Sequence, residues 1–209
     1  MENSLDYEIL SVGHTFYKNG IKLFTYYLEY LNLIGNTPAL VELNKKNFLE
    51  AIRRQTYAVN QLYVEAQEAY NTGSEAFPYE YDSRIHVTMN QNNIFSGYLE
   101  EYIFTGGAHG NTTREAFTYD SHTLETRTLC SFMKEENCLP CISENIIQQI
   151  NNSGHIGDYF PEYKSLVPQF LNAENFYITP EGVIVYFDLY SIAPYVSGIK
   201  EYIIPVNSC

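Results

Sequence analysis

The chain has 209 residues, 45% of them hydrophobic, which suffices for the core of one sizeable domain or two small ones. Its 25 acidic residues against 12 lysines and arginines give a formal charge of −13, which disfavours nucleic acid and anionic lipid as partners. The sequence contains no apolar run of roughly 18 residues, the length that a membrane-spanning helix needs. Its N-terminus lacks the basic start of a secretory signal. We expect a soluble chain, either cytoplasmic or trimmed behind an upstream signal or anchor.

The first part of the chain is expected to be extended and then helical. Residues 5–34 are predicted to form strands joined by a hairpin turn at Lys18-Asn19-Gly20. Apolar residues then recur at spacings of three, four and seven, which predicts a long amphipathic helix. Asn44 or Asn47 is expected to cap its start, and Gly73 follows its end.

From Tyr79 onward the pattern returns to the alternation typical of strands in an antiparallel sheet. A second helix is predicted over residues 142–152 with Ser143 as its cap, and a short third helix is expected to stop at Pro168. Two strands around the turn Pro180-Glu181-Gly182 and a last strand near the C-terminus complete the sheet, with Val183 to Tyr190 alternating between its faces.

These elements predict an α+β fold, an antiparallel sheet on which one long helix and shorter helices pack. No linker or repeat interrupts the pattern, so residues 1–209 are expected to form a single domain. Its N-terminal part is expected to cover about residues 5–75, and its sheet-rich C-terminal part about residues 76–209.

The four cysteines leave the redox state of the chain open. Cys138-Leu-Pro-Cys141 has the spacing of half a zinc knuckle or of a redox pair. A second pair of ligands at similar spacing is missing, so we expect no metal and favour plain thiols or a local disulfide.

The glycine-rich stretch Thr-Gly-Gly-Ala-His-Gly at residues 105–110 is a candidate for a phosphate-binding loop, a metal site or a catalytic loop. It matches neither a P-loop nor a dinucleotide fingerprint, and no nucleophile elbow or His-Glu-x-x-His motif occurs in the chain. Gly106, Gly107 and Gly110 are expected to supply positive φ angles and a close backbone approach between two strands. A lone loop histidine such as His109 is more often a turn residue than a base, so we expect neither catalysis nor a cofactor.

Three stretches together carry a family resemblance: "YIFTGGAHGNTTREAFTYD", "NFYITPEGVIVYFDLYSIAPYVSG" and the earlier "LEYLNL". They resemble the extracellular domain of the RsiV-like anti-sigma factors. That family also includes many uncharacterised bacterial proteins and the accessory domain of some peptidoglycan deacetylases. The resemblance implies an α+β domain that is not itself catalytic and that, in the RsiV proteins, binds lysozyme.

The resemblance also implies which residues would bind. Pro194 and Tyr195 of "IAPYVSG" are expected to face the saccharide-binding cleft of lysozyme. Tyr190 and the turn with Gly106, Gly107 and His109 are expected to support that surface, although Tyr190 could equally be a sheet residue packed beneath the loop. The segments needed for the anti-sigma role and the catalytic module of the deacetylase are not found in this sequence.

Three functional hypotheses follow. The first is a binding domain for lysozyme, another basic protein or a cell-wall glycan, towards which the charge of −13 would steer a basic partner. The second is a small hydrolase that uses His109 with a carboxylate brought near by the fold. The third is a regulatory interaction module.

Overall fold

The computed structural model describes residues 4–73 and 78–209, and over these residues the chain forms eight strands in two sheets together with helices, which confirms the α+β class. The five-stranded sheet has the order β1-β2-β3-β4-β5, and the three-stranded sheet has the order β6-β7-β8. The strands are β1 (Tyr7–Lys18), β2 (Ile21–Leu33), β3 (Tyr79–Gln91), β4 (Ile94–Phe104), β5 (Asn111–Asp120), β6 (Phe176–Thr179), β7 (Gly182–Phe187) and β8 (Lys200–Ile204). The α-helices are α1 (Pro38–Tyr57), α2 (Tyr63–Asn71), α3 (Leu139–Asn152) and α4 (Tyr163–Phe170).

The residues group into two compact units that interleave along the chain. The first unit comprises Leu5–His86 and Leu99–Arg114, and the second consists mainly of Val87–Tyr98 and Glu115–Cys209. Strands β3, β4 and β5 each contribute residues to both units. The expectation of a single domain stays a prediction, and its internal boundary near residue 75 lies outside the described residues.

In the first unit the predicted hairpin is confirmed. Strands β1 and β2 pair antiparallel along their whole length and are joined by Asn19 and Gly20, whose φ angles are 52° and 80°. Two successive positive φ angles are what a tight two-residue turn between twisted strands requires, and Asn-Gly adopts them at little cost.

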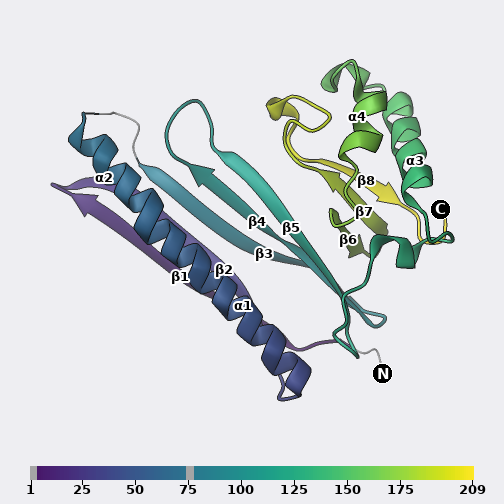
Figure 1. The fold of residues 1–209 in the computed structure, drawn as a ribbon, viewed down its shortest axis with the longest axis horizontal. Helices are drawn as coiled ribbons and strands as arrows, with labels where there is room; N and C mark the ends of the chain where they lie inside the picture. The colour runs from purple at the N-terminus through teal and green to yellow at the C-terminus, as the bar shows by residue number, and fades with distance from the viewer. Residues whose placement is uncertain (1–3, 74–77) are drawn as a thin grey trace. The chain divides into compact units, whose positions relative to one another are not determined.

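One long helix follows the hairpin and lies along it in Figure 1. It runs through α1, a π-helical segment η1 (Ala58–Leu62) and α2, and Gly73 after it adopts a φ of 80°. The predicted caps are wrong, because the helix starts earlier and Thr37 accepts a hydrogen bond from the Leu40 amide at 3.3 Å. The sequence-based prediction missed the first turn, Pro38-Ala39-Leu40-Val41, which begins with a proline at the position that suits it.

The two asparagines expected as caps bind the backbone of β2 instead. The Asn44 side chain accepts a hydrogen bond from the Leu33 amide at 2.8 Å and donates one to the Leu33 carbonyl at 2.7 Å. The Asn47 amide donates to the Leu31 carbonyl at 3.0 Å. Both side chains therefore replace a neighbouring strand where β3 no longer pairs with β2.

The expectation of an antiparallel sheet fails for one pair of strands. Strand β3 pairs parallel with β2, from Phe24 opposite Tyr79 to Leu28 opposite Ser83. The long helix returns the chain to the end of the sheet at which β2 began, so the next strand must run in the same direction.

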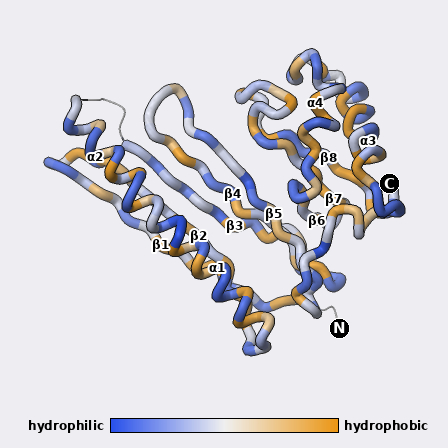
Figure 2. The backbone as a smooth tube through the Cα atoms, viewed as in Figure 1, coloured by the Kyte–Doolittle hydropathy of each residue, from blue (hydrophilic) through white to orange (hydrophobic). Residues whose placement is uncertain are grey.

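The core of the first unit is aromatic and lies between the helix and the hairpin. Phe24, Tyr26 and Leu28 point from β2 towards Ala58, Leu62 and Ala66 of the helix. Phe16 stacks on Tyr63 with a centroid separation of 4.0 Å. Along the helix, hydrophobic stretches follow hydrophilic ones at short intervals, as expected of an amphipathic helix (Figure 2).

In the second unit β7 is the central strand of the small sheet and is buried on both faces. Val183, Val185 and Phe187 pack in the cluster formed with α3 and α4, whereas Ile184 and Tyr186 pack with Tyr177 on the other face. The strand ends at Phe187, three residues before its predicted end. The expected turn between β6 and β7 is confirmed at residues 180–181.

Two details of the shorter helices correct the sequence expectations. Helix α3 begins at Leu139, and Ser143 is a buried residue of its interior rather than a cap. Pro168 lies inside α4, which continues for two more residues to Phe170. The missing N–H of Pro168 removes one helical hydrogen bond, the one to the carbonyl of Lys164 four positions earlier, without ending the helix.

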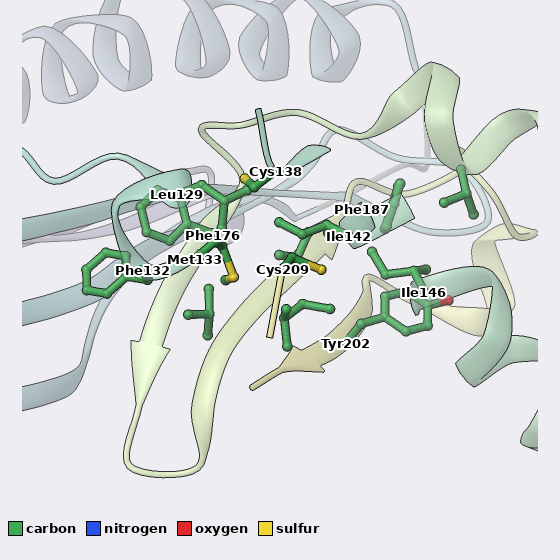
Figure 3. Packing of buried hydrophobic residues seen from close by; sticks show 14 of the residues in the cluster. Leu129, Phe132, Met133, Cys138, Ile142, Ile146, Phe176, Phe187, Tyr202 and Cys209 are labelled. Carbon is green, nitrogen blue, oxygen red and sulfur yellow. The ribbon is translucent and has the colours of Figure 1, made fainter. Parts of the chain in front are cut away.

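All four cysteines form disulfides, and none joins Cys138 to Cys141. Cys130 pairs with Cys138, and Cys141 pairs with the C-terminal Cys209 over a separation of 68 residues. Figure 3 shows Cys138 and Cys209 within the buried cluster of the second unit. The C-x-x-C motif is therefore neither a redox pair nor half a zinc site, because the sulfur atoms of Cys138 and Cys141 are bonded to Cys130 and Cys209.

Candidate functional site

The segment after β7, residues 188–198, brings two of the predicted binding residues together, and we name it the tyrosine loop. The rings of Tyr190 and Tyr195 lie 5.7 Å apart, centroid to centroid, and are tilted by 37°. Tyr190 is 55% exposed and has a φ of 64°. This left-handed conformation is uncommon for a large side chain, and such strain persists only where the surrounding structure holds it.

Buried residues and backbone hydrogen bonds hold the tyrosine loop. Ile192 and Ala193 are buried in the core cluster of the second unit. The Ile192 carbonyl accepts a hydrogen bond from the Phe160 amide at 3.1 Å, and the Ser197 hydroxyl donates to the Asp158 carbonyl at 2.9 Å. The loop is thus fixed in its middle and near its end.

The fixed backbone presents side chains to solvent at two places. One is Tyr190, and the other is a single 3₁₀ turn, Tyr195–Ser197, which Pro194 precedes. Val196, at the centre of that turn, is 91% exposed. Sequence reasoning missed Val196, although it directly follows Tyr195 in the quoted motif.

The second unit carries most of the negative charge. Over residues 87–98 and 115–209 there are twelve acidic and four basic side chains, a net charge of −8 of the total −13. An acidic surface of this kind accelerates encounter with basic partners at low ionic strength.

The glycine turn, residues 105–110, lies in the first unit between β4 and β5. Gly106 and Gly107 have φ angles of 96° and 95°. A Cβ atom on the buried Gly110 would overlap the Tyr102 ring and lie 2.6 Å from the Ile103 carbonyl oxygen. Both structural roles expected of these glycines, positive φ and close backbone approach, are confirmed.

His109 is exposed, and its Nδ1 lies 2.9 Å from the Gly110 carbonyl oxygen. A carbonyl oxygen only accepts, so Nδ1 carries the hydrogen in this contact. The contact is local and orients the ring within the turn.

The predicted site residues therefore occupy two places. Tyr190, Pro194 and Tyr195 belong to the tyrosine loop of the second unit, and Gly106, Gly107 and His109 belong to the glycine turn of the first. Within residues 4–73 and 78–209, no three histidines, cysteines or acidic residues are grouped to hold a metal ion. None of the helices in that part of the chain combines the length and hydropathy of a membrane span.

Two family models match the chain. Residues 23–112, which hold most of the first unit including the glycine turn, match the model described as "Deacetylase PdaC". Residues 132–207, which include the tyrosine loop, match "Protein of unknown function (DUF3298)". The chain therefore carries a PdaC deacetylase-like segment followed by a DUF3298 segment. No curated protein sequence matches it.

Solved structures share the fold over nearly the whole chain. A member of the DUF3298 family from Bacteroides fragilis NCTC 9343 is 18% identical, with a TM-score of 0.62. The match covers 98% of this chain and 92% of the Bacteroides chain. A DUF3298 family protein from Pseudomonas aeruginosa PAO1 is 21% identical with a TM-score of 0.65, covering 96% and 90%. At these identities the likeness concerns the fold alone.

Proposed function

We propose that the chain is a non-catalytic binding module that recognises a basic protein of the cell-wall environment, with lysozyme as the specific candidate. The observation that carries the proposal is the pair of tyrosines on the anchored tyrosine loop, with Val196 exposed beside them. These residues project from an acidic unit of net charge −8.

The chemistry of this surface suits a protein cleft that normally binds sugar. Tyrosine supplies a large apolar face and a hydroxyl, and it loses little conformational entropy because it has only two side-chain torsions. Residues of this kind are enriched among those that dominate binding energy at interfaces. Because Ile192 and Ala193 anchor the loop, little of the binding energy is lost in ordering it.

The comparisons support the setting of the proposal. The match of residues 23–112 to the model named for a deacetylase agrees with the sequence resemblance to the accessory domain of peptidoglycan deacetylases. The match of residues 132–207 places the tyrosine loop in a segment of unknown function, for which a binding role is open.

Isothermal titration calorimetry with lysozyme tests the proposal. We expect a complex that weakens as the ionic strength rises, because salt screens the attraction between an acidic and a basic protein. Truncating Tyr195 or Tyr190 to alanine should weaken binding by about 30-fold, the scale of a hot-spot residue worth about 2 kcal/mol. Tyr17→Ala is the matched control, since Tyr17 is 63% exposed but belongs to the first unit.

Two results would contradict the proposal in different ways. Absence of any heat or complex with lysozyme at low ionic strength would exclude lysozyme as the partner. A complex that Tyr190→Ala, Tyr195→Ala and Tyr17→Ala all leave unchanged would retain the partner but exclude the tyrosine loop as the binding surface.

A further inference from the structure

The outer strand of the five-stranded sheet, β1, has one edge to which no described strand is paired. The hydrogen bond from the Ile34 amide to the Asp6 carbonyl, 2.8 Å long, fixes which residues of β1 bond to β2. In an antiparallel pair bonded residues alternate, so Ile9, Ser11, Gly13 and Thr15 direct their N–H and C=O groups away from β2. These residues form a regular ladder along the open edge.

Proteins usually protect such an edge with proline, lysine or a bulge. In β1 a bulge between Phe16 and Tyr17 and the lysine at position 18 protect only the tip of the hairpin. Residues 7–15 contain no proline, lysine or bulge, so this stretch can accept another strand.

An exposed apolar stripe on α1 borders the same edge. Val41, Phe48 and Ile52 are spaced by seven and four residues and therefore lie on one side of the helix, and they are 55%, 49% and 41% exposed. Phe48 lies 6.0 Å from the ring of Tyr30, which is opposite Leu10 of β1 in the hairpin register. Leu10 is itself 36% exposed, so apolar surface continues from the helix to the edge strand.

We propose that β1 pairs antiparallel with β1 of a second copy of this chain, with the two-fold axis at Ser11. In this register Leu10 lies opposite Val12 of the second copy on the face that also carries the helix. On the same face Glu8 lies opposite His14 of the second copy, and symmetry repeats both pairs. Apolar meets apolar and a carboxylate meets an imidazole, so the strand is complementary to itself.

The available area also suits a dimer. Half-exposed apolar side chains of β1 and α1 each offer on the order of 100 Å², given that an aromatic residue buries about 150–250 Å² in full. Six such side chains are available. They are Leu10, Val41, Phe48 and Ile52 on the face that carries the helix, and Tyr7 and Ile9 on the other face of β1. Together they offer about 600 Å² per partner, which is within the range of specific interfaces although below the roughly 800 Å² of a standard one.

A cross-linking experiment on the full chain tests the register. At the two-fold axis the Cα atoms of the two Ser11 residues would lie about 5.5 Å apart, within the range that a disulfide spans. Ser11→Cys should therefore form a disulfide-linked dimer under oxidising conditions. Thr15→Cys is the matched control, because its two copies would be about 27 Å apart and should not cross-link.

Sedimentation equilibrium with a charge swap provides the second test. His14→Glu places two carboxylates opposite each other twice in the dimer and should raise the dimer dissociation constant by about 2- to 30-fold. Combining it with Glu8→Lys restores opposite charges and should return the constant to within about twofold of the wild type. Circular dichroism of each variant verifies that the fold is intact.

The proposal is overturned if the wild-type chain sediments as a monomer at every attainable concentration. It is equally overturned if Ser11→Cys cross-links no better than Thr15→Cys, or if the double variant is as weak as His14→Glu alone. Preferential cross-linking at Ser11 together with rescue by the charge swap would support it.

Discussion

The two disulfides should differ in how much they stabilise the second unit, and the structure gives the size of the difference. Cys130–Cys138 closes a loop with a sequence separation of 8, and Cys141–Cys209 closes one of 68. The entropy that each removes from the unfolded chain grows with the logarithm of loop length, which corresponds to about 2.5 and about 4.4 kcal/mol. Removing the disulfide Cys141–Cys209 should therefore lower the free energy of unfolding by about 2 kcal/mol more than removing Cys130–Cys138.

The comparison is well matched because each disulfide has one partner in the core. Cys138 and Cys209 are both buried, and Cys130 and Cys141 are both half-buried at its border. Replacing each pair by alanines thus removes similar packing, and no odd thiol remains to exchange. The free energy of unfolding is measured by urea denaturation without reductant, followed by circular dichroism. Equal losses, or a larger loss for Cys130→Ala/Cys138→Ala, would show that loop length does not set the contribution of these disulfides to stability.

Three further predictions concern the first unit. Asn44→Ala should lower the free energy of unfolding by about 2–3 kcal/mol, because it leaves two backbone groups of β2 without their partner. Asn47→Ala removes only one hydrogen bond and should lower it by about 1 kcal/mol in the same urea experiment. Gly110→Ala should lower the melting temperature by several degrees, since its Cβ would overlap the Tyr102 ring; an unchanged melting temperature would show that the ring can move aside. Burial, together with the hydrogen bond to Glu101, raises the pKa of Tyr81 above its ordinary value of 10.0. The protonated Tyr81 therefore contributes fully to the free energy of unfolding below about pH 10, and this contribution should be lost as the pH rises further. The free energy of unfolding of Tyr81→Phe, measured from neutral pH to above pH 10, should fall less steeply than that of the wild type.

The candidate site was predictable to the extent that it is local in sequence. The glycines of the glycine turn follow from the need for positive φ and close approach, which is a property of a few neighbouring residues. The motif around Tyr195 identified the tyrosine loop as a segment. Its anchoring by Phe160 and Asp158 and the exposure of Val196 depend on residues more than 30 positions away and could not be inferred.

Local propensity and hydrophobic periodicity specify the α+β class, the hairpin at Asn19-Gly20, the long helix and the turn at residues 180–181, so these features were predictable from the chain alone. The packing of distant segments settled the rest. It turned Asn44 and Asn47 from expected caps into partners of β2, paired Cys141 with Cys209 rather than Cys138, and buried both faces of β7. In each case the outcome depends on which distant segment supplies the hydrogen-bond partner, the second cysteine or the covering surface. The periodicity of residues along the chain does not specify that segment.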